Sequence, residues 1–299
     1  MAVKKQKSNW YIYVITFLIT LGIAVLAVQS MDEILFPKKS SDALNYEAVS
    51  YLPSEVNNMT TLVMLSEMKA GTPDLYMIVG YRPNKETIAL IPISKQLKAT
   101  VGFTTGTLTQ HYQNGGAESV MLAIHNAMGV EFDNYVKFDK ISFIDFIDEI
   151  GKVSVNSSYD IPSGTVDEDG NREIFLTSGA HALNGADLYT YLSYTNDELG
   201  DDYRNMTFSS VAMSIFNSNF RNLSSTLLQS YFNKIINTTD TDMRFEDYTL
   251  RQQAFMYTSE NSYNPAVYYI PYGTYEEDGS FVIAENSVAT IKDRLGITE

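Results

Sequence analysis

The sequence predicts an α/β (α+β) protein with a central mixed sheet flanked by helices and preceded by one N-terminal transmembrane helix. Short apolar runs of strand character alternate with amphipathic helical segments along most of the chain. That order is typical of a mixed sheet covered by helices. A separate, uninterrupted apolar run near the N-terminus predicts the membrane segment.

The predicted transmembrane helix covers residues 10–28, which contain no charge and no proline. A helix of that length, at about 1.5 Å per residue, spans roughly 28 Å, close to the hydrocarbon thickness of a bilayer. Lys4, Lys5 and Lys7 precede it, so residues 1–9 are expected to be a cytoplasmic tail. The alternative is a cleaved signal peptide. The run is long for one, and the following A-V-Q-S-M-D is a poor cleavage sequence.

Everything after this helix is therefore expected outside the cytoplasm, held at the cell membrane by a single pass. Residues 29–56 predict a stalk, because Pro37 and the adjacent K-K-S-S break any regular pattern. Residues 57–299 predict one extracytoplasmic domain, since they contain no internal repeat and no second linker. This length is sufficient to bury a substantial core.

Composition excludes several classes of function. The formal charge is −15, and residues 1–30 carry three lysines and no acid, so the outer part carries −18. Such a charge disfavours nucleic acids as general partners. The chain has no cysteine, which excludes disulfides, thiol nucleophiles and cysteine-bound zinc. A large exported domain without disulfides favours a bacterial envelope. His111, His125 and His181 lack HxxxH or HExxH spacing.

The first half of the domain predicts strands and two helices. Strands are expected at 60–65, 75–81, 87–93 and 132–138. The second and third should form a hairpin, because R-P-N-K-E separates them. A helix over 117–129 is predicted from apolar residues at helical spacing, with Gly129 as its stop.

The segment 141–150 is predicted to be an amphipathic helix that ends at Gly151. Its apolar face should consist of Ile141, Phe143, Ile144, Phe146, Ile147 and Ile150. The opposite face should expose Asp145, Asp148 and Glu149. A strand at K-V-S-V-N is expected to follow.

The second half predicts a polar loop and further helices before a mixed C-terminal segment. The loop is expected at 163–172, a helix at 178–191, and a helical region at 206–236 divided near Asn222. Asp242 or Asp247 is expected to start another helix. The segments V-Y-Y-I-P-Y and F-V-I predict strands before a last short helix.

Common catalytic signatures are absent from the sequence, including a GxSxG elbow, a Walker loop and a GxGxxG after a strand. Six blocks taken in order, however, resemble the LytR-CpsA-Psr (LCP) family across most of residues 59–235. The blocks are L-V-M-L-S-E, D-L-Y-M-I-V-G-Y-R-P, L-I-P-I-S-K-Q, H-Y-Q-N-G-G-A-E, the stretch from Y-V-K-F-D to G-K-V-S-V-N, and L-N-G-A-D-L-Y-T-Y.

The resemblance implies an LCP-like domain whose relatives bind a polyprenyl-pyrophosphate-linked glycopolymer and hold the lipid in an apolar tunnel. They transfer the phospho-glycan to peptidoglycan with a divalent metal such as Mg²⁺. It places the family's metal-binding aspartates on Glu67 and Asp74. Lys95 falls on the arginine of an I-P-R-D-T element, and Arg204 keeps the first arginine of R-I-x-R-Q.

The same resemblance places neutral residues where the family has arginines. These are Thr72, Ser193, Thr195 and Thr207, and Gln96 stands on an aspartate. Breaking a pyrophosphate bond requires stabilisation of charge by cations. Lysine at position 95 does not reproduce a bidentate guanidinium. The sequence therefore predicts a pseudoenzyme with a degenerate phosphotransferase site.

The predicted function is a non-catalytic binding, scaffold or regulatory protein of cell-wall glycopolymer assembly. Expected partners are the membrane, a polyprenyl-phosphate lipid or cell-wall glycopolymer, and envelope proteins, but no nucleic acid. Two alternatives stay open: a divergent phosphotransferase that uses Mg²⁺, and a structural subunit of an envelope machine. Glu67, Asp74, Lys95 and Arg204 are either a remnant site or ordinary surface residues. The Met- and Phe-rich segments line either a lipid tunnel or a closed core.

Overall fold

The computed structural model describes residues 51–166, 172–195, 200–221 and 223–297. The predicted cytoplasmic tail, the transmembrane helix over 10–28 and most of the predicted stalk lie outside these residues. Within the described ranges, no helix combines the length and hydropathy needed to cross a membrane. Tyr51–Glu299 group into one unit, and the domain boundary at residue 57 stays a prediction.

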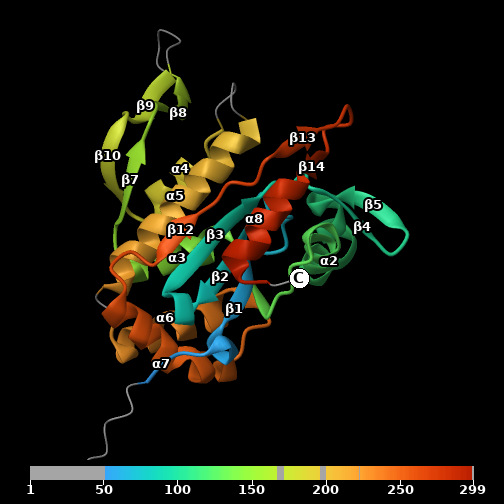
Figure 1. Ribbon diagram of the computed structural model, residues 1–299. Helices are drawn as coiled ribbons and strands as arrows, with labels where there is room; N and C mark the ends of the chain where they lie inside the picture. Colours follow the sequence, from blue (N-terminus) through green and yellow to red (C-terminus); the bar gives the residue numbers. More distant parts are fainter. Residues whose placement is uncertain (1–50, 167–171, 196–199, 222, 298–299) are drawn as a thin grey trace, which may run out of the picture. The chain divides into compact units, whose positions relative to one another are not determined.

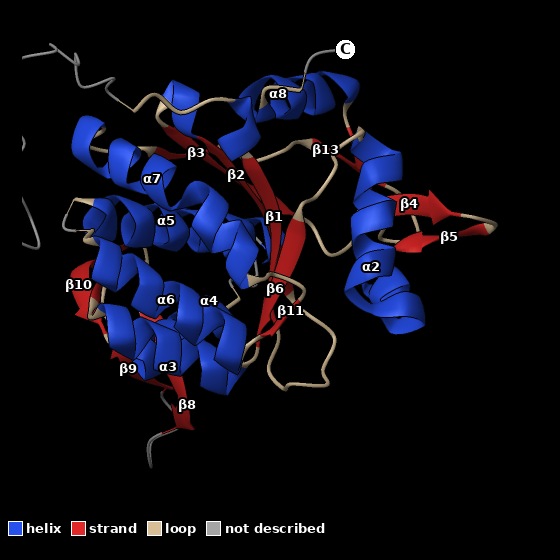
Figure 2. Ribbon diagram, turned by 90° about the horizontal axis from the view of Figure 1, so that it is seen from below, coloured by secondary structure: helices blue, strands red, loops and turns tan. Residues whose placement is uncertain are grey.

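A six-stranded mixed sheet forms the centre of this unit, in the order β11-β6-β1-β2-β3-β12. Figure 1 labels β1, β2, β3 and β12 of this sheet, and Figure 2 labels β6 and β11 beside β1. The strands are β1 (Met59–Leu65), β2 (Leu75–Arg82), β3 (Thr87–Ile93), β6 (Asn134–Phe138), β11 (Asp240–Thr241) and β12 (Ala266–Tyr268). β2 runs antiparallel to both β1 and β3. β6 is parallel to β1, and β12 is parallel to β3.

Helices cover both faces of the sheet (Figure 2). They are α2 (Leu108–Met128), α3 (Lys140–Ile150), α4 (Gly185–Ser193), α5 (Gly200–Phe220), α6 (Ser225–Thr238), α7 (Phe245–Asn261) and α8 (Glu285–Leu295). Helices α3 to α7 lie on one face, and α2 and α8 lie on the other. A sheet covered on both sides is expected to be apolar on both sides, and every residue of β2 is buried.

Two apolar cores result, one on each face of the sheet. Tyr81 of β2 stacks on Phe255 of α7 with ring centroids 4.3 Å apart, in the core beneath α3 to α7. Its neighbour Gly80 points the other way, where an added Cβ would lie 2.3 Å from Leu295 of α8. That contact belongs to the core beneath α2 and α8.

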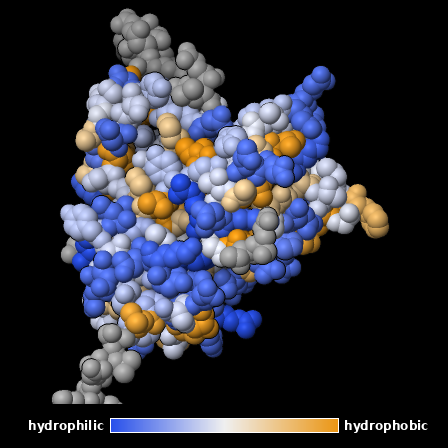
Figure 3. Space-filling view, in the orientation of Figure 1, coloured by the Kyte–Doolittle hydropathy of each residue, from blue (hydrophilic) through white to orange (hydrophobic). Residues whose placement is uncertain are grey.

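Smaller two-stranded sheets extend from the body. Within the described residues they pair β4 (Lys98–Val101) with β5 (Thr104–Thr107), β7 (Val153–Ser157) with β10 (Gly179–Leu183), β8 (Ile161–Val166) with β9 (Arg172–Leu176), and β13 (Gly273–Tyr275) with β14 (Phe281–Ile283). The β4–β5 hairpin projects from the molecule, and its turn carries the fully exposed Phe103. Figure 3 shows hydrophobic colour at that end, and further hydrophobic patches are scattered over the same, mostly hydrophilic face.

Most of the predicted elements are confirmed. The strands at 60–65, 75–81, 87–93 and 132–138 correspond to β1, β2, β3 and β6, and β2 and β3 form the predicted hairpin. The long helical region divides between Phe220 and Ser225, close to the expected break. Helix α2 ends at Gly129 as expected but begins earlier, with a kink at Gly115 and Gly116.

Three predictions after residue 160 differ from the structure, two in the type of element and one only in where a helix starts. The ends of the predicted loop at 163–172 are strand, because β8 continues to Val166 and β9 starts at Arg172, whereas residues 167–171 lie outside the described ranges. The first part of the helix predicted at 178–191 is strand β10, because it pairs with β7, and α4 begins only at Gly185 after the capping residue Asn184. The helix expected to start at Asp242 or Asp247 starts at Phe245.

Ile141 is 72% exposed and does not belong to the apolar face of α3. At about 100° per residue it lies roughly 160° from Phe143 around the helix. Phe143 and Ile147 are buried, with Phe146 and Ile150 packed beside them. The apolar face of α3 therefore consists of these four residues.

Candidate functional site

A polar cavity of about 370 Å³ lies at the edge of the sheet where β1 ends and β2 begins. Its walls come from the loop between these strands, the start of α3, the end of α4 and the start of α5. Charged residues on the walls are Glu67, Asp74, Lys140 and Arg204. Segments far apart in the sequence thus meet at one site.

The β1–β2 hairpin brings the two carboxylates together. Leu65 and Leu75 pair across the hairpin, and the Asp74 N–H donates to the Leu65 carbonyl at 2.9 Å. On the other side of the loop, the Lys140 N–H donates to the Glu67 carbonyl at 3.4 Å. These bonds hold Glu67 and Asp74 beside the first residue of α3.

Helices α4 and α5 supply the opposite walls. Asn184 caps α4 by accepting a hydrogen bond from the Asp187 N–H at 2.9 Å, and the helix ends at Ser193, which lines the cavity. Arg204 lies in the second turn of α5. Its Nε is buried and has no hydrogen-bond partner in the part of the chain that the structure describes. An unsatisfied buried donor of this kind is costly to leave without a partner.

The Lys95 ammonium is neutralised by two carboxylates. It lies 3.5 Å from Oδ1 of Asp74 and 3.6 Å from Oδ1 of Asp201. Lys95 itself is not part of the cavity wall. Its positive charge is therefore balanced by these carboxylates and is not available to a ligand.

Tyr189 of α4 lies among the charged groups. Burial is the main cause that raises the pKa of its hydroxyl, the carboxylates of Glu67 and Asp74 raise it further, and a hydrogen bond with Ser193 and the charge of Arg204 lower it. The Lys140 ammonium lies 5.2 Å from the centroid of its ring, within the range of a cation–π contact.

The structure thus brings together four of the positions singled out from the sequence. Glu67, Asp74, Ser193 and Arg204 line the cavity, and Lys95 contacts Asp74.

Four other positions lie away from the cavity wall. Thr72 and Thr195 are not part of it, and Thr207 is buried within α5. Gln96 serves the scaffold, since its carbonyl accepts a hydrogen bond from the Phe281 N–H at 2.7 Å.

Sequence reasoning missed Lys140 and Tyr189. A signal existed for Lys140, which follows β6 directly at the edge where β1 also ends. Ligands of mixed sheets commonly bind at the carboxyl ends of parallel strands. Tyr189 carries no such signal, because a tyrosine within a helical apolar run is usually core.

The carboxylates fit a magnesium ion. Mg²⁺ is usually held by one or two carboxylates together with the phosphates of a substrate, and Glu67 and Asp74 both line the cavity. Among the described residues, no group of three or more metal-ligating side chains is assembled. These two residues would therefore hold the ion jointly with a phosphate-bearing ligand.

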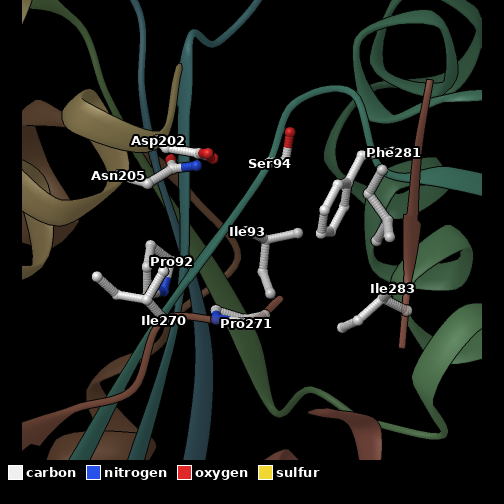
Figure 4. Close-up of a pocket in the computed structure, with 10 residues that line it drawn as sticks. Pro92, Ile93, Ser94, Asp202, Asn205, Ile270, Pro271, Phe281 and Ile283 are labelled. Atoms are coloured by element: carbon white, nitrogen blue, oxygen red, sulfur yellow. The ribbon is translucent and has the colours of Figure 1, made fainter. Parts of the chain in front are cut away.

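A second, much smaller cavity lies between the end of β3, the start of α5 and strand β14 (Figure 4). Ile93, Phe281 and Ile283 line it, with Asp202 and Asn205 at one end. Its volume of about 20 Å³ is close to that needed for one water molecule. It is too small for a phosphate or sugar ligand.

Comparison with known proteins assigns a family model to most of this chain. The model described as the LytR_cpsA_psr family matches residues 37–295. The teichoic acid transferase TagV of Bacillus subtilis is 29% identical over 182 residues, covering 56% of this chain and 46% of TagV. TagU of Bacillus licheniformis is 23% identical over 261 residues, covering 82% of each chain. Both are named polyisoprenyl-teichoic acid–peptidoglycan teichoic acid transferases. The chain thus spans about half the length of TagV.

Solved structures share the mixed α/β fold. A putative transcription regulator from Eubacterium siraeum superposes with a TM-score of 0.75 at 26% identity, covering 86% of this chain and 98% of the other. B. subtilis TagV gives a TM-score of 0.65 at 18% identity, covering 82% of this chain and 100% of the TagV chain in that crystal structure. TagT bound to LIIa-WTA gives 0.64 at 16% identity, covering 81% and 92%. At these last identities the likeness shows the fold alone.

Proposed function

This chain belongs to the LytR_cpsA_psr family, and we propose that it acts in cell-envelope glycopolymer assembly by binding a polyprenyl-pyrophosphate-linked glycan without transferring it. The names of its relatives, which are teichoic acid transferases, support the envelope role. The same names specify a polyisoprenyl-linked teichoic acid, which supports a lipid-linked glycopolymer as the ligand.

The charge of the cavity carries the non-catalytic part of the proposal. Ser193 is neutral on the wall where the resemblance expects a guanidinium, and the Lys95 charge is taken up by Asp74 and Asp201. Each lost donor that stabilises a transition state typically costs about 10²–10³ in rate. Binding needs fewer such groups than transfer, because additional negative charge develops on the leaving phosphate as the pyrophosphate bond breaks.

Glu67 and Asp74 are the groups that would hold Mg²⁺, which when bound supplies positive charge to the phosphate oxygens. Arg204 adds a guanidinium whose buried Nε lacks a partner among the described residues. A phosphate oxygen is a suitable acceptor for such a donor. The cavity therefore supports phosphate binding.

We expect purified full-length protein with Mg²⁺ neither to release polyprenyl phosphate from a polyprenyl-pyrophosphate glycan nor to transfer its phospho-glycan to peptidoglycan fragments above background. The cationic groups that stabilise the breaking bond are absent at Ser193 and neutralised at Lys95. The measurement is glycan transfer to peptidoglycan fragments, followed by mass spectrometry. The same protein should retain the lipid-linked glycan through detergent purification.

Ser193→Arg is the companion variant, because Ser193 lines the cavity whereas Thr72 and Thr195 do not. It should tighten pyrophosphate binding, and the gain should shrink as salt rises. Thr195→Arg serves as the matched control. Turnover by the unmodified protein that disappears in Asp74→Ala would refute the non-catalytic proposal.

A divergent but active transferase is the second candidate. The observation that favours it is that Glu67, Asp74 and Arg204 line the same cavity. Two carboxylates that could bind a metal ion and one guanidinium are thus kept together. The transfer assay above distinguishes the two candidates directly.

Membrane anchoring with the domain outside the cytoplasm completes the proposal. A reporter enzyme fused after Glu299 should be active only on the outer side, because Lys4, Lys5 and Lys7 precede the apolar run. The protein should also remain in the membrane fraction after a high-salt wash. Release of a soluble form that begins near Met31 would show that the segment is a cleaved signal.

A further inference from the structure

We infer that Lys140 is the second phosphate-binding cation of the polar cavity, and that Tyr189 positions it. This inference deepens the proposed function and rests on it. It assigns a role in ligand binding to Lys140 of α3 and Tyr189 of α4, neither of which is among the sequence positions singled out above.

The first argument is the state of the cations around the cavity. Lys95 is engaged by Asp74 and Asp201. Within the described part of the chain, by contrast, the ion pairs involve neither Lys140 nor Arg204. Both line the cavity, Lys140 from α3 and Arg204 from α5. They are therefore the cations available to an anionic ligand.

The second argument is the charge balance of the cavity wall. Lys140 and Arg204 together only cancel Glu67 and Asp74. A divalent ion held by the two carboxylates leaves two positive charges in excess, which balance the two negative charges of a pyrophosphate diester. Without Lys140 half of that excess is lost, so phosphate binding should depend on this lysine.

The third argument is the position of Lys140 in its helix. It is the first residue of α3, directly after the capping residue Asp139. Helix N-termini favour anions and disfavour cations, so helix stability does not explain a lysine here. A lysine side chain is also flexible, so a neighbouring group must hold its ammonium in place if it is to bind a ligand.

Tyr189 supplies that orientation. Its ring centroid lies 5.2 Å from the Lys140 ammonium, and both residues line the cavity. The ring face attracts the ammonium through its quadrupole without neutralising the charge. The lysine is thereby held at the cavity while its N–H donors remain available to phosphate oxygens.

The test is titration of the full-length protein in detergent with geranyl pyrophosphate at fixed free Mg²⁺, by calorimetry. Lys140→Met should raise the Kd by about 10-fold or more, since charge-assisted hydrogen bonds are among the strongest polar contacts, and should make the Kd less dependent on salt. Lys140→Arg should stay within about threefold. Lys152→Met, at an exposed lysine just past the far end of α3, is the control and should not change the Kd.

Tyr189 is tested as a positioning residue with a conservative pair. Tyr189→Phe keeps the ring face and should bind like the unmodified protein, whereas Tyr189→Leu removes it and should weaken binding several-fold. In the double variant Lys140→Met/Tyr189→Leu the second change should add little, because the group that the ring orients is already absent.

The possible outcomes separate this inference from the proposed function. If Lys140→Met binds like the unmodified protein and Arg204→Met binds more weakly, the role of Lys140 is overturned and the proposed function stands. Tyr189→Phe as weak as Tyr189→Leu overturns the positioning by the ring face. No binding by the unmodified protein at any Mg²⁺ concentration overturns both proposals together.

Discussion

Arg204→Met is expected to weaken the binding of geranyl pyrophosphate by about 10- to 100-fold in the same titration. A hydrogen bond to a charged group contributes about 1.5–3 kcal/mol, and each 1.4 kcal/mol is about tenfold in Kd. The buried Nε of Arg204 has no partner among the described residues, so a phosphate would satisfy a donor that is otherwise unpaired. Methionine keeps the apolar stem and removes only the guanidinium.

Arg221→Met is the matched control for this variant. Arg221 also lies in the α5 region, but its guanidinium stacks on the ring of Tyr263 at 3.2 Å from the centroid and is not part of the cavity. It removes the same charge from the protein, so general electrostatic effects should appear equally in both variants. Equal Kd values for Arg204→Met and Arg221→Met would contradict the assignment of the cavity as a phosphate site.

The sheet was predictable because its signals are local. The runs that form β1, β2 and β3 are apolar on both faces, and the polar turn at Pro83 fixes the hairpin between two of them. Burial on both sides needs no alternation, so these strands stand out from composition alone. The same locality makes α3 predictable, with Gly151 at its end.

Strand β10 was not predictable because its structure depends on a distant partner. The segment Gly179–Leu183 consists mainly of small residues with helical or neutral propensity, and it becomes a strand through pairing with β7. Tertiary pairing overrides such weak local preference. The assignment of Ile141 to the apolar face of α3 was wrong for a different reason, because it counted apolar residues without considering their angle around the helix.

The candidate site was predictable in its parts but not in its assembly. Resemblance to the family selected Glu67, Asp74 and Arg204, and the β1–β2 hairpin and α5 bring them to one cavity. It also selected Thr72 and Thr195, which lie off the cavity wall, because alignment does not specify where a loop residue points.

Neither Lys140 nor Tyr189 has a motif that marks it. Their proximity to each other arises from the packing of α3 against α4, through contacts such as the ring pair Phe143 and Tyr189 with centroids 6.2 Å apart. The surroundings of Ser193 and the ion pairs of Lys95 could be seen only in the structure, because the pair with Asp201 joins the segment after β3 to α5. Charge balance, rather than residue identity, distinguishes binding from transfer.

The largest stability effect is expected at Arg82, which is buried at the end of β2. Its Nη1 donates to the carbonyls of Met59 at 3.0 Å and Tyr81 at 2.8 Å, its Nη2 donates to Thr60 Oγ1 at 2.9 Å, and its Nε donates to the Leu295 carbonyl at the end of α8. One side chain thus joins β1, β2 and the C-terminal helix. Burial lowers the pKa of Arg82, and the nearby Asp133 carboxylate opposes that effect.

Arg82→Met should lower the free energy of unfolding by about 3–5 kcal/mol, because several buried acceptors lose their donor at about 1–3 kcal/mol each. For a domain of this size, the midpoint of thermal unfolding should fall by about 10 °C. Hydrogen exchange should locate part of the loss in α8, since Arg82 holds the Leu295 carbonyl there. Lys85→Met, at an exposed lysine of the next turn (Pro83–Lys85), is the control and should change stability by less than about 0.5 kcal/mol. A loss below about 1 kcal/mol with unchanged protection of α8 would show that the Arg82 hydrogen bonds do not hold this helix on the sheet.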